Sequence, residues 1–388
     1  MKKLRVGVIY GGRSGEHEVS VASAASIIRH LDRTRFDPVP IRIEKDGRWT
    51  LADKPPMSVS AAEVLEHGRL DVARPAKSRR ETFLVAHPGD DTLVTVERRD
   101  LADPRQADNS AMVTGLGLDV IFPVLHGPYG EDGTVQGLLE LANVPYVGAG
   151  VLGSAVGMDK AVMKTLFAAA GLPIVPHMVV IRSQWERDAP ALTARAAATL
   201  TYPVFVKPAN LGSSVGISKA KTHEEFAAAM TLALQFDRKI VIEAAVPNAR
   251  EIECGVLGND APEASIPGEI VPSREFYDYE AKYLDEGSTP IIPAPLLESQ
   301  VRDVQRLSIE AFRAVDGAGM SRVDFLLARD TGAMYVNEVN TIPGFTTISM
   351  YPRMWEASGL PYPSLIDRLI TLALERHAEK QHLRTSIT

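Results

Sequence analysis

The stretch Arg322-Val-Asp-Phe-Leu-Leu-Ala-Arg-Asp-Thr-Gly-Ala-Met-Tyr-Val-Asn-Glu-Val-Asn340 contains two apolar runs joined by a polar turn. The runs 321–327 and 334–339 each predict a strand, and the turn centred near Thr331 predicts a hairpin. This hairpin sets Asp324 across from Glu338 and Arg322 across from Asn340. Because side chains alternate at period two along a strand, the four polar side chains share one face.

The oxygen atoms on this face suit a hard cation. Two carboxylates and an amide oxygen on a rigid frame leave coordination positions for phosphate and water, which predicts a magnesium-nucleotide site. A cross-strand ion pair on a solvated sheet face is the alternative interpretation. The turn Thr341-Ile-Pro-Gly344 favours the site, because a loop directly after the strand can carry substrate contacts.

Length and composition indicate an ordinary globular protein with several domains. At 388 residues the chain exceeds one hydrophobic core, so we expect two or three domains of about 100 to 150 residues each. Apolar residues make up 45% and charged residues 23%, as in soluble proteins. No apolar run reaches the roughly 20 residues of a membrane span, and the start does not read as a signal peptide. We therefore expect a cytoplasmic protein with no membrane partner.

Cysteine usage and net charge exclude further classes of function. Cys254 is the only cysteine, which rules out an internal disulfide framework and a cysteine-based zinc site, and we expect it in the core. The net charge of −7 argues against nucleic acid as the main partner. Phosphate binding must then come from locally placed lysines and arginines.

The N-terminal part begins like a parallel α/β unit. An apolar run at 4–10 ends in two glycines and is followed by a helical pattern at 19–31, and further strands are expected at 39–43 and 120–125. Between about 48 and 114 we expect hairpins and loops that carry no chemistry.

The remaining chain mixes helices and strands. Helical patterns cover 134–142, 161–170 and an alanine-rich stretch at 190–200, and strands are expected at 204–207, 240–243 and 251–257. The segment 273–293 is dense in tyrosine and charge and is predicted to be a lid. A closing amphipathic helix at 365–374 and a polar tail after about Ala378 complete the expected order.

Two glycine-rich patterns point to different kinds of nucleotide site. Gly148-Ala-Gly-Val-Leu-Gly153 fits the dinucleotide pattern and raises an oxidoreductase as an alternative, but the acidic ribose ligand expected about 20 residues later is missing. The sequence contains no P-loop pattern. Leu211-Gly-Ser-Ser-Val-Gly216 follows the strand that delivers Lys207, and its glycines allow backbone N–H groups to approach phosphate oxygens. Lys160, at the start of a helix, and Lys282, in the predicted lid, would add positive charge to the phosphate site formed by Lys207 and this loop.

Seven segments together resemble the ATP-grasp superfamily and, within it, the D-alanine:D-alanine ligase family. In order they are Gly11-Gly-Arg-Ser-Gly-Glu-His-Glu-Val-Ser20, Phe122-Pro-Val-Leu-His-Gly-Pro-Tyr-Gly-Glu-Asp-Gly133, Met158-Asp-Lys160, Val206-Lys-Pro208 with Gly212-Ser-Ser-Val-Gly216, Phe276-Tyr-Asp-Tyr-Glu-Ala-Lys-Tyr283, Arg322-Val-Asp-Phe325, and Asn337-Glu-Val-Asn-Thr-Ile-Pro-Gly344. They span nearly the whole chain. Two departures are mild: Ala244 stands where the family often has a lysine beside the adenine, and the region 48–114 marks a long-form member.

The resemblance implies both a fold and an activity. The implied fold is α/β, with α+β character in the ATP-binding half: a three-domain ATP-grasp fold with an N-terminal Rossmann-like parallel-sheet domain at 1–148. The central ATP-grasp subdomain would span 149–244, and a C-terminal subdomain at 245–388 would carry the metal site and the lid. The implied activity joins two D-alanine molecules through an acylphosphate for peptidoglycan precursors, with ATP, two Mg²⁺ ions that Mn²⁺ can replace, and a homodimeric enzyme.

The resemblance also assigns site residues by position. The metal ligands would be Asp324, Glu338 and Asn340. ATP would contact Lys160, Lys207, Ser213, Ser214, Glu243, Val246, Glu251 and Lys282. The substrates and the oxyanion would contact Glu16, His126, Arg322, Gly344, Ser349 and Met350, and Glu16, Ser213 and Tyr283 would form a hydrogen-bonded set that joins three domains.

Three other functions remain as alternatives at this point. A ligase that takes D-lactate as second substrate is disfavoured by Tyr283, because the depsipeptide-forming members resemble a version in which this tyrosine is replaced. D-serine is harder to reject, since a small pocket discriminates weakly against a single hydroxyl. A non-catalytic ATP-binding regulator is disfavoured by the three retained metal ligands and Lys282.

Overall fold

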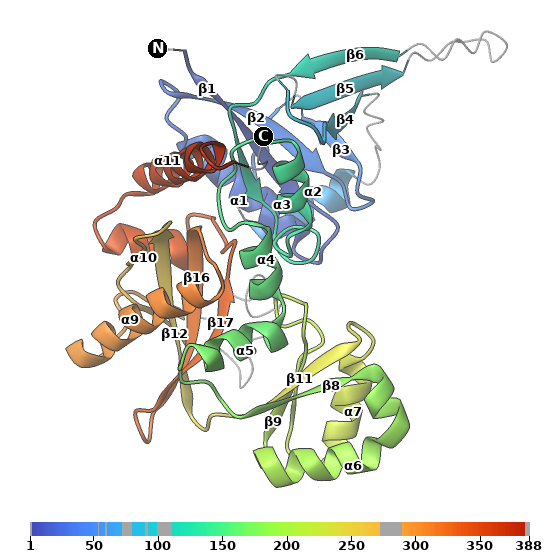
Figure 1. Ribbon diagram of the computed structural model, residues 1–388, viewed down its shortest axis with the longest axis vertical. Helices are drawn as coiled ribbons and strands as arrows, with labels where there is room; N and C mark the ends of the chain where they lie inside the picture. Colours follow the sequence, from blue (N-terminus) through green and yellow to red (C-terminus); the bar gives the residue numbers. More distant parts are fainter. Residues whose placement is uncertain are drawn as a thin grey trace, which may run out of the picture.

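The computed structural model describes residues 2–52, 54–58, 60–71, 80–89, 92–98, 111–271 and 289–384. These ranges contain four sheets, and Figure 1 shows them as an upper body, a body beside α9 and α10, and a smaller lower body with α6 and α7. No helix in these ranges has the length and apolar character needed to cross a bilayer. The expected lid falls almost entirely in 272–288, outside the described residues, together with Lys282 and Tyr283.

The N-terminal sheet confirms the expected parallel α/β unit. Its order is β3-β2-β1-β7, with β1 (Leu4–Gly11) parallel to β2 (Phe36–Ile43) and to β7 (Val120–Val124), and with β3 (Trp49–Leu51) antiparallel on β2. Helix α1 (His17–His30) packs with one face of β1 and α3 (Thr134–Leu141) with the other. Both faces of β1 are therefore covered, which explains its continuous apolar run.

The region between β3 and β7 is only partly as expected. β4 (Arg80–Leu84), β5 (Leu93–Arg98) and β6 (Ala111–Leu116) form an antiparallel sheet, which confirms the predicted hairpins. The expectation of hairpins and loops alone was wrong, because α2 (Ala61–Asp71) forms there. This helix packs on α1 and places Val64 against the N-terminal core, so tertiary contact supplies what its weak sequence pattern does not.

The middle of the chain forms a small antiparallel sheet with its own core. Its order is β10-β9-β11-β8, and its strands are β8 (His177–Ile181), β9 (Val204–Pro208), β10 (Ser218–Ala220) and β11 (Lys239–Ala244). Helices α6 (Arg182–Leu200), which is kinked at Asp188, and α7 (His223–Ala233) supply Ala196 and Phe226 to the same apolar cluster as Val206 and Ile242. These strands and helices form the lower body in Figure 1, and the clustered side chains form its core.

The C-terminal sheet is built around the predicted hairpin. Its order is β15-β14-β12-β16-β17, with β13 also on β12; the strands are β12 (Ala249–Gly258), β13 (Glu263–Ala264), β14 (Gly268–Val271), β15 (Thr289–Ile291), β16 (Gly319–Ala328) and β17 (Met334–Asn340). Helices α4 (Val151–Met158) and α5 (Lys160–Ala169) precede this sheet in the chain, and α9 (Glu298–Ala314) packs beside it. Cys254 is fully buried here, as expected, and burial raises its pKa to about 11.

The last two helices return to the N-terminal sheet. Helix α10 (Met350–Ala357) leads into α11 (Tyr362–Gln381), and Leu365 and Leu369 of α11 share an apolar cluster with Val8 of β1. The closing helix is longer than expected, from Tyr362 to Gln381, so the exposed tail expected after about Ala378 begins as its last turn. Its last turn is anchored on α3, where Lys380 pairs with Glu140 and Gln381 donates to Asn143.

Candidate active site

The hairpin β16–β17 places its polar side chains as the sequence predicts. Asp324 pairs with Glu338 and Arg322 with Asn340, in antiparallel register. The register then shifts, so that Phe325 pairs with Val336 and Asn337 becomes the extra residue of a bulge. This bulge turns Asn337 toward the middle sheet, where its backbone oxygen lies 3.4 Å from Lys164 Nζ and its side-chain oxygen 3.5 Å from Lys207 Nζ.

The charges on this face are already compensated within the protein. Arg322 donates from Nε and from Nη2 to the two oxygens of Asp324, at 2.6 and 2.7 Å, and Asn340 donates to Asp324 Oδ2 at 3.0 Å. Lys160 Nζ lies 3.4 Å from Glu338 Oε2. Two carboxylates held by cationic partners, with an amide beside them, are a donor set that a hard divalent cation also fits. Among the described residues, no group of three or more His, Cys, Asp or Glu side chains is placed so that it could hold a metal ion.

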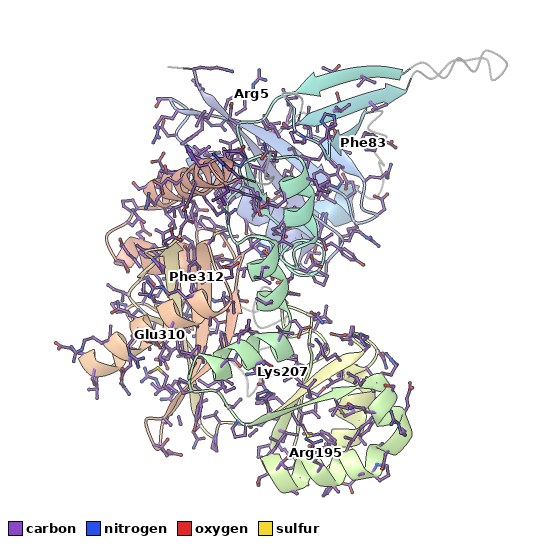
Figure 2. All side chains as sticks on the ribbon, viewed as in Figure 1. Arg5, Phe83, Arg195, Lys207, Glu310 and Phe312 are labelled. Atoms are coloured by element: carbon purple, nitrogen blue, oxygen red, sulfur yellow. The ribbon has the colours of Figure 1, made fainter. Side chains whose placement is uncertain are left out.

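A buried ion-pair cluster lies between the middle sheet and α5. Glu243 on β11 pairs with Lys207 of β9 at 2.7 Å and with Lys164 of α5 at 2.9 Å. Burial favours the neutral form of Glu243, but the two ammonium groups outweigh it and lower its pKa to about 2. Figure 2 shows Lys207 beside α5, at the edge of the lower body. The sequence did not identify Lys164, which is 1% exposed and falls inside an ordinary helical pattern.

A third group of residues, around Glu16, joins the N-terminal sheet to the glycine-rich loop. Glu16 lies at the start of α1, and Ser213 Oγ donates a hydrogen bond to its carboxylate. Gly212 lies close to the same carboxylate, because a Cβ at this position would stand 2.7 Å from Glu16 Oε2 and would force the carboxylate to shift. Ser213 and Ser214 both have positive φ, which turns the loop back toward α1. Lys160 donates to the Leu211 carbonyl at 2.8 Å and so holds the other end of this loop.

His126, directly after β7, faces the same cluster. Its Nδ1 lies 2.9 Å from the carbonyl oxygen of Ile342, which can only accept, so Nδ1 carries the proton. Its Nε2 is buried and has no hydrogen-bond partner among the described residues. Burial lowers the pKa of His126, and the nearby Glu16 opposes that shift. Burial thus favours the neutral imidazole, with Nε2 as a hydrogen-bond acceptor, whereas an anionic ligand beside Nε2 would favour the protonated form.

The loop after β17 carries the remaining substrate candidates. Ser349 precedes α10, and its Oγ accepts from Thr346 N–H at 3.0 Å. Gly344 lies against Ser349, because a Cβ on Gly344 would stand 3.1 Å from Ser349 Oγ. Met350 starts α10 and is buried with Ile270 and Met354. Glu131, which the sequence did not identify, is buried beside this loop.

The structure thus brings many of the expected residues together in the hairpin face, the ion-pair cluster and the group around Glu16. Arg322, Asp324, Glu338 and Asn340 lie on one hairpin face, which Lys160 links to the glycine-rich loop and to Glu16 and Ser213. Val246 follows β11, and Glu251 lies on β12. Against the effect of burial, the carboxylate of Glu243 and, to a smaller extent, those of Glu338 and Glu251 raise the pKa of Lys207. Lys282 and Tyr283 are not among the described residues.

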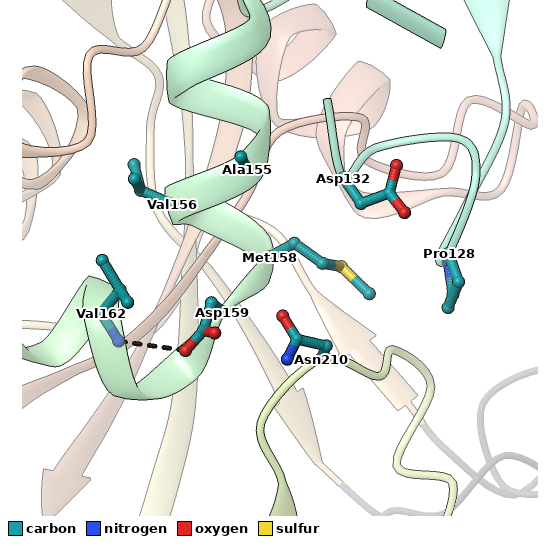
Figure 3. Close-up of a pocket in the computed structure, with 8 residues that line it drawn as sticks. All are labelled: Pro128, Asp132, Ala155, Val156, Met158, Asp159, Val162 and Asn210. Atoms are coloured by element: carbon teal, nitrogen blue, oxygen red, sulfur yellow. Dashed lines mark hydrogen bonds between the residues drawn. The ribbon is translucent and has the colours of Figure 1, made fainter. Parts of the chain in front are cut away.

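A cavity of about 440 Å³ is lined by residues that neighbour these clusters in sequence (Figure 3). Pro128 and Asp132 line one side, the corner between α4 and α5 another, and Asn210 a third. Its polar groups are engaged inside the protein: Asp132 accepts from two backbone N–H groups, and Asn210 donates to Asp237. The cavity therefore presents no set of converging free donors or acceptors.

Comparisons with known proteins agree with this arrangement. The sequence models described as D-ala D-ala ligase N-terminus and C-terminus match residues 5–149 and 166–371. The D-alanine–D-alanine ligase of Heliobacterium modesticaldum is 49% identical, over 99% of this chain and 98% of its own. That of Geobacillus kaustophilus is 48% identical, over 98% of this chain and 97% of its own.

Solved structures show the same architecture. The D-alanine–D-alanine ligase of Coxiella burnetii superimposes with a TM-score of 0.76 at 37% identity, over 98% of this chain and 97% of that chain. The VanG D-Ala:D-Ser ligase of Enterococcus faecalis gives a TM-score of 0.76 at 32% identity, over 96% of this chain and 100% of that chain. The fold inferred from the sequence is therefore confirmed, and this chain belongs to the D-alanine–D-alanine ligase family.

Proposed function

We propose that this chain joins two molecules of D-alanine into D-alanyl-D-alanine and converts ATP to ADP and phosphate. Membership of the family supports the reaction. The structural observation that carries the assignment to this site is the hairpin face with Asp324, Glu338 and Asn340, linked by Lys160 to the loop that holds Ser213 against Glu16. Metal, phosphate and amino-acid ligands would then meet in one place.

The reaction needs an activated carboxyl group. A carboxylate is a poor electrophile, so the first D-alanine takes the γ-phosphoryl group of ATP and becomes an acylphosphate. Lys160 and Lys207 would hold phosphate oxygens, and Lys282 would approach the γ-phosphate. Asp324, Glu338 and Asn340 would hold Mg²⁺, which neutralises charge on the transferring group when it is bound. Arg322 and Lys160, which now face Asp324 and Glu338, would then be released toward the substrate.

The amino-acid side of the site is assigned by charge and placement. Glu16 would bind the ammonium group of the first D-alanine, with His126 close to its carboxylate. The amine of the second D-alanine attacks the acylphosphate, and Arg322 with the Gly344 N–H would stabilise the oxyanion. A donor of this kind contributes roughly 3 kcal/mol to the transition state. Ser349 and Met350 would receive the second D-alanine, and Glu243, Val246 and Glu251 would line the adenosine pocket.

Water must be kept from the acylphosphate. The loop 212–216 closes one side through the bond from Ser213 to Glu16, and we propose that the lid with Tyr283 closes the other. We also propose that the chain divides into three domains, with boundaries at 148 and 244. We further propose that the enzyme is a homodimer and is located in the cytoplasm. D-serine as second substrate is the competing assignment, because the VanG ligase has the same fold.

The deciding experiment measures ADP release with D-alanine, with L-alanine and with no amino acid, followed by mass analysis of the product. We expect release with D-alanine only and a product with the mass of a D-alanine dipeptide. Competition between D-alanine and D-serine or D-lactate at equal concentration then fixes the second substrate. Equal ADP release with and without D-alanine would reject the proposed function.

A further inference from the structure

One backbone segment of the site is held by side chains from the N-terminal part of the chain. The Ile342 N–H donates to Glu131 Oε2 at 3.3 Å, and the Ile342 carbonyl accepts from His126 Nδ1 at 2.9 Å. Three residues later, the Phe345 N–H donates to Ser23 Oγ of α1 at 3.2 Å. Gly344 therefore lies between two anchored peptide groups, and both anchors come from outside the C-terminal sheet.

Glu131 spans two loops that are distant in sequence. Its Oε1 accepts from the Gly127 N–H at 3.2 Å, in its own loop after β7, while its Oε2 accepts from Ile342, 211 residues away. Glu131 is 9% exposed, and burial together with the charge of Glu16 raises its pKa to about 8. With this pKa the carboxyl group is largely neutral near pH 7, and each of its oxygens faces one backbone N–H group.

Glu131 and His126 together hold both backbone polar groups of Ile342: its N–H, which belongs to the peptide unit before it, and its carbonyl, which belongs to the unit after it. Loss of either side chain would leave one of these two peptide units unanchored. His126 commits only Nδ1 to this contact, and its Nε2 is buried without a hydrogen-bond partner among the described residues. Gly127, in the same loop as both residues, lies against Glu16. The first-substrate end of the site and the segment with Gly344 are thus tied to a common support.

We propose that Glu131 is a positioning residue for the ligation step, which holds Ile342 so that the N–H of Gly344 lies where the oxyanion forms. This inference rests on the proposed function. An oxyanion donor acts only if it is placed before the reaction, and a displacement of about 1 Å costs on the order of 100-fold in rate. The metal ligands proposed for phosphoryl transfer are held by the pairing of β17 with β16, so we expect that step to depend less on this support.

The test compares Glu131→Gln with Asp132→Asn. Glutamine keeps the shape of Glu131, but its NH₂ group cannot accept, so one of the two backbone N–H groups loses its partner. Asp132 is a matched control, since it also accepts from two backbone N–H groups, those of Tyr129 at 2.9 Å and Thr134 at 3.0 Å, both within its own loop. For each variant, kcat, the KM for ATP and the ratio of dipeptide to ADP are measured.

For Glu131→Gln we expect kcat for dipeptide to fall roughly 10- to 100-fold, with the KM for ATP unchanged within about twofold. Because the acylphosphate still forms and then hydrolyses, the ratio of dipeptide to ADP should fall clearly below one. Asp132→Asn should keep the wild-type ratio. Equal loss in the two variants, or a Glu131→Gln enzyme that keeps a ratio of one, would overturn the inference.

A second variant covers a failure of Glu131→Gln to fold. Ser23→Ala removes the acceptor of the Phe345 N–H and changes no charge, so it loosens the other anchor of the same segment. We expect a smaller fall in kcat with the same drop in the ratio of dipeptide to ADP; an unchanged ratio would contradict the anchoring. Wild-type enzyme that makes no dipeptide would instead reject the proposed function, independently of either variant.

Discussion

The charge of the buried Glu243 carboxylate is set by partners that are remote in sequence. The resemblance assigned it to the adenosine pocket, and its strand was predicted correctly. The structure adds Lys164 and Lys207 on two other elements, which keep its buried carboxylate charged. In the proposed complex with ATP, Lys207 would turn to a phosphate oxygen and Lys164 would remain as the counter-charge of Glu243. No local pattern could reveal this, because Lys164 reads as one more residue of a helix.

Replacement of Lys164 by methionine should destabilise the protein. Methionine keeps most of the volume but leaves Glu243 with one cationic partner, and breaking a buried pair in this way costs roughly 3 to 5 kcal/mol. Urea unfolding measures the loss. The control is Lys380→Met, which removes an exposed pair with Glu140 and should cost at most about 1 kcal/mol. A similar loss of unfolding free energy in both variants would show that the buried cluster around Glu243 stabilises the protein no more than an exposed ion pair does.

The same cluster predicts acid sensitivity. The pKa of Glu243 falls from an unfolded value near 4.5 to about 2 in the folded protein, so its contribution is complete above pH 4.5 and is lost as pH falls toward 2. The difference in free energy of unfolding between the wild type and Glu243→Gln should shrink over that range. A difference that is constant from pH 6 to pH 3 would contradict the assignment.

Glu338 offers the sharpest test of the metal site. Glu338→Gln removes one anionic ligand but leaves the hairpin register and the partner Asp324 in place. We expect phosphate release to be abolished while the melting temperature changes by only a few degrees. Asp330→Asn is a suitable control, since Asp330 lies exposed in the hairpin turn. Near-normal turnover of Glu338→Gln would remove the metal assignment.

At the scale of elements, the sequence predicted the hairpin but did not reveal the structural role of the glycine pattern 148–153. Period-two alternation and a turn fix the register of β16 and β17, including Asp324 opposite Glu338. The bulge at Asn337 carries no such signal. Gly148-Ala-Gly-Val-Leu-Gly153 fits a dinucleotide pattern, yet in the structure it opens α4 against the backbone of the segment after α9. Its glycines serve close packing of a helix on a loop.

Gly153→Ala should therefore destabilise the protein, although Gly153 lies in a helix. An added Cβ would come within 2.3 Å of the Asp316 carbonyl oxygen, which is backbone and cannot yield easily. Overpacking of this kind costs roughly 1 to 3 kcal/mol. In Gly137→Ala, within α3, the Cβ meets nothing within 4 Å, so that variant should be neutral or gain up to about 1 kcal/mol. Thermal unfolding of both variants decides the matter.

At the scale of the whole molecule, the apolar clusters cross the sequence boundaries expected at 148 and 244. Met163 and Phe167 of α5 pack with Val323 and Phe312 of the C-terminal sheet and α9, although they precede the middle sheet in the chain. The C-terminal helix α11 likewise joins the N-terminal core. The sequence alone cannot show that a helix packs on the sheet of another domain. An amphipathic pattern shows which face of a helix is buried but not which sheet covers it.

This arrangement predicts which parts of the chain share their stability. Leu369 of α11 is fully buried in the cluster that also contains Val8 and Phe122, whereas the middle sheet has a separate cluster around Phe226. Leu369→Ala should cost about 2 to 5 kcal/mol by leaving a cavity. Hydrogen exchange should then accelerate in β1 and β7 but not in β9 and β11. The control is Leu383→Ala, at a side chain that is 67% exposed, which should leave exchange unchanged. Equal acceleration in β9 and β11 would mean that the middle sheet unfolds together with the rest, since its own core would then be insufficient to hold it.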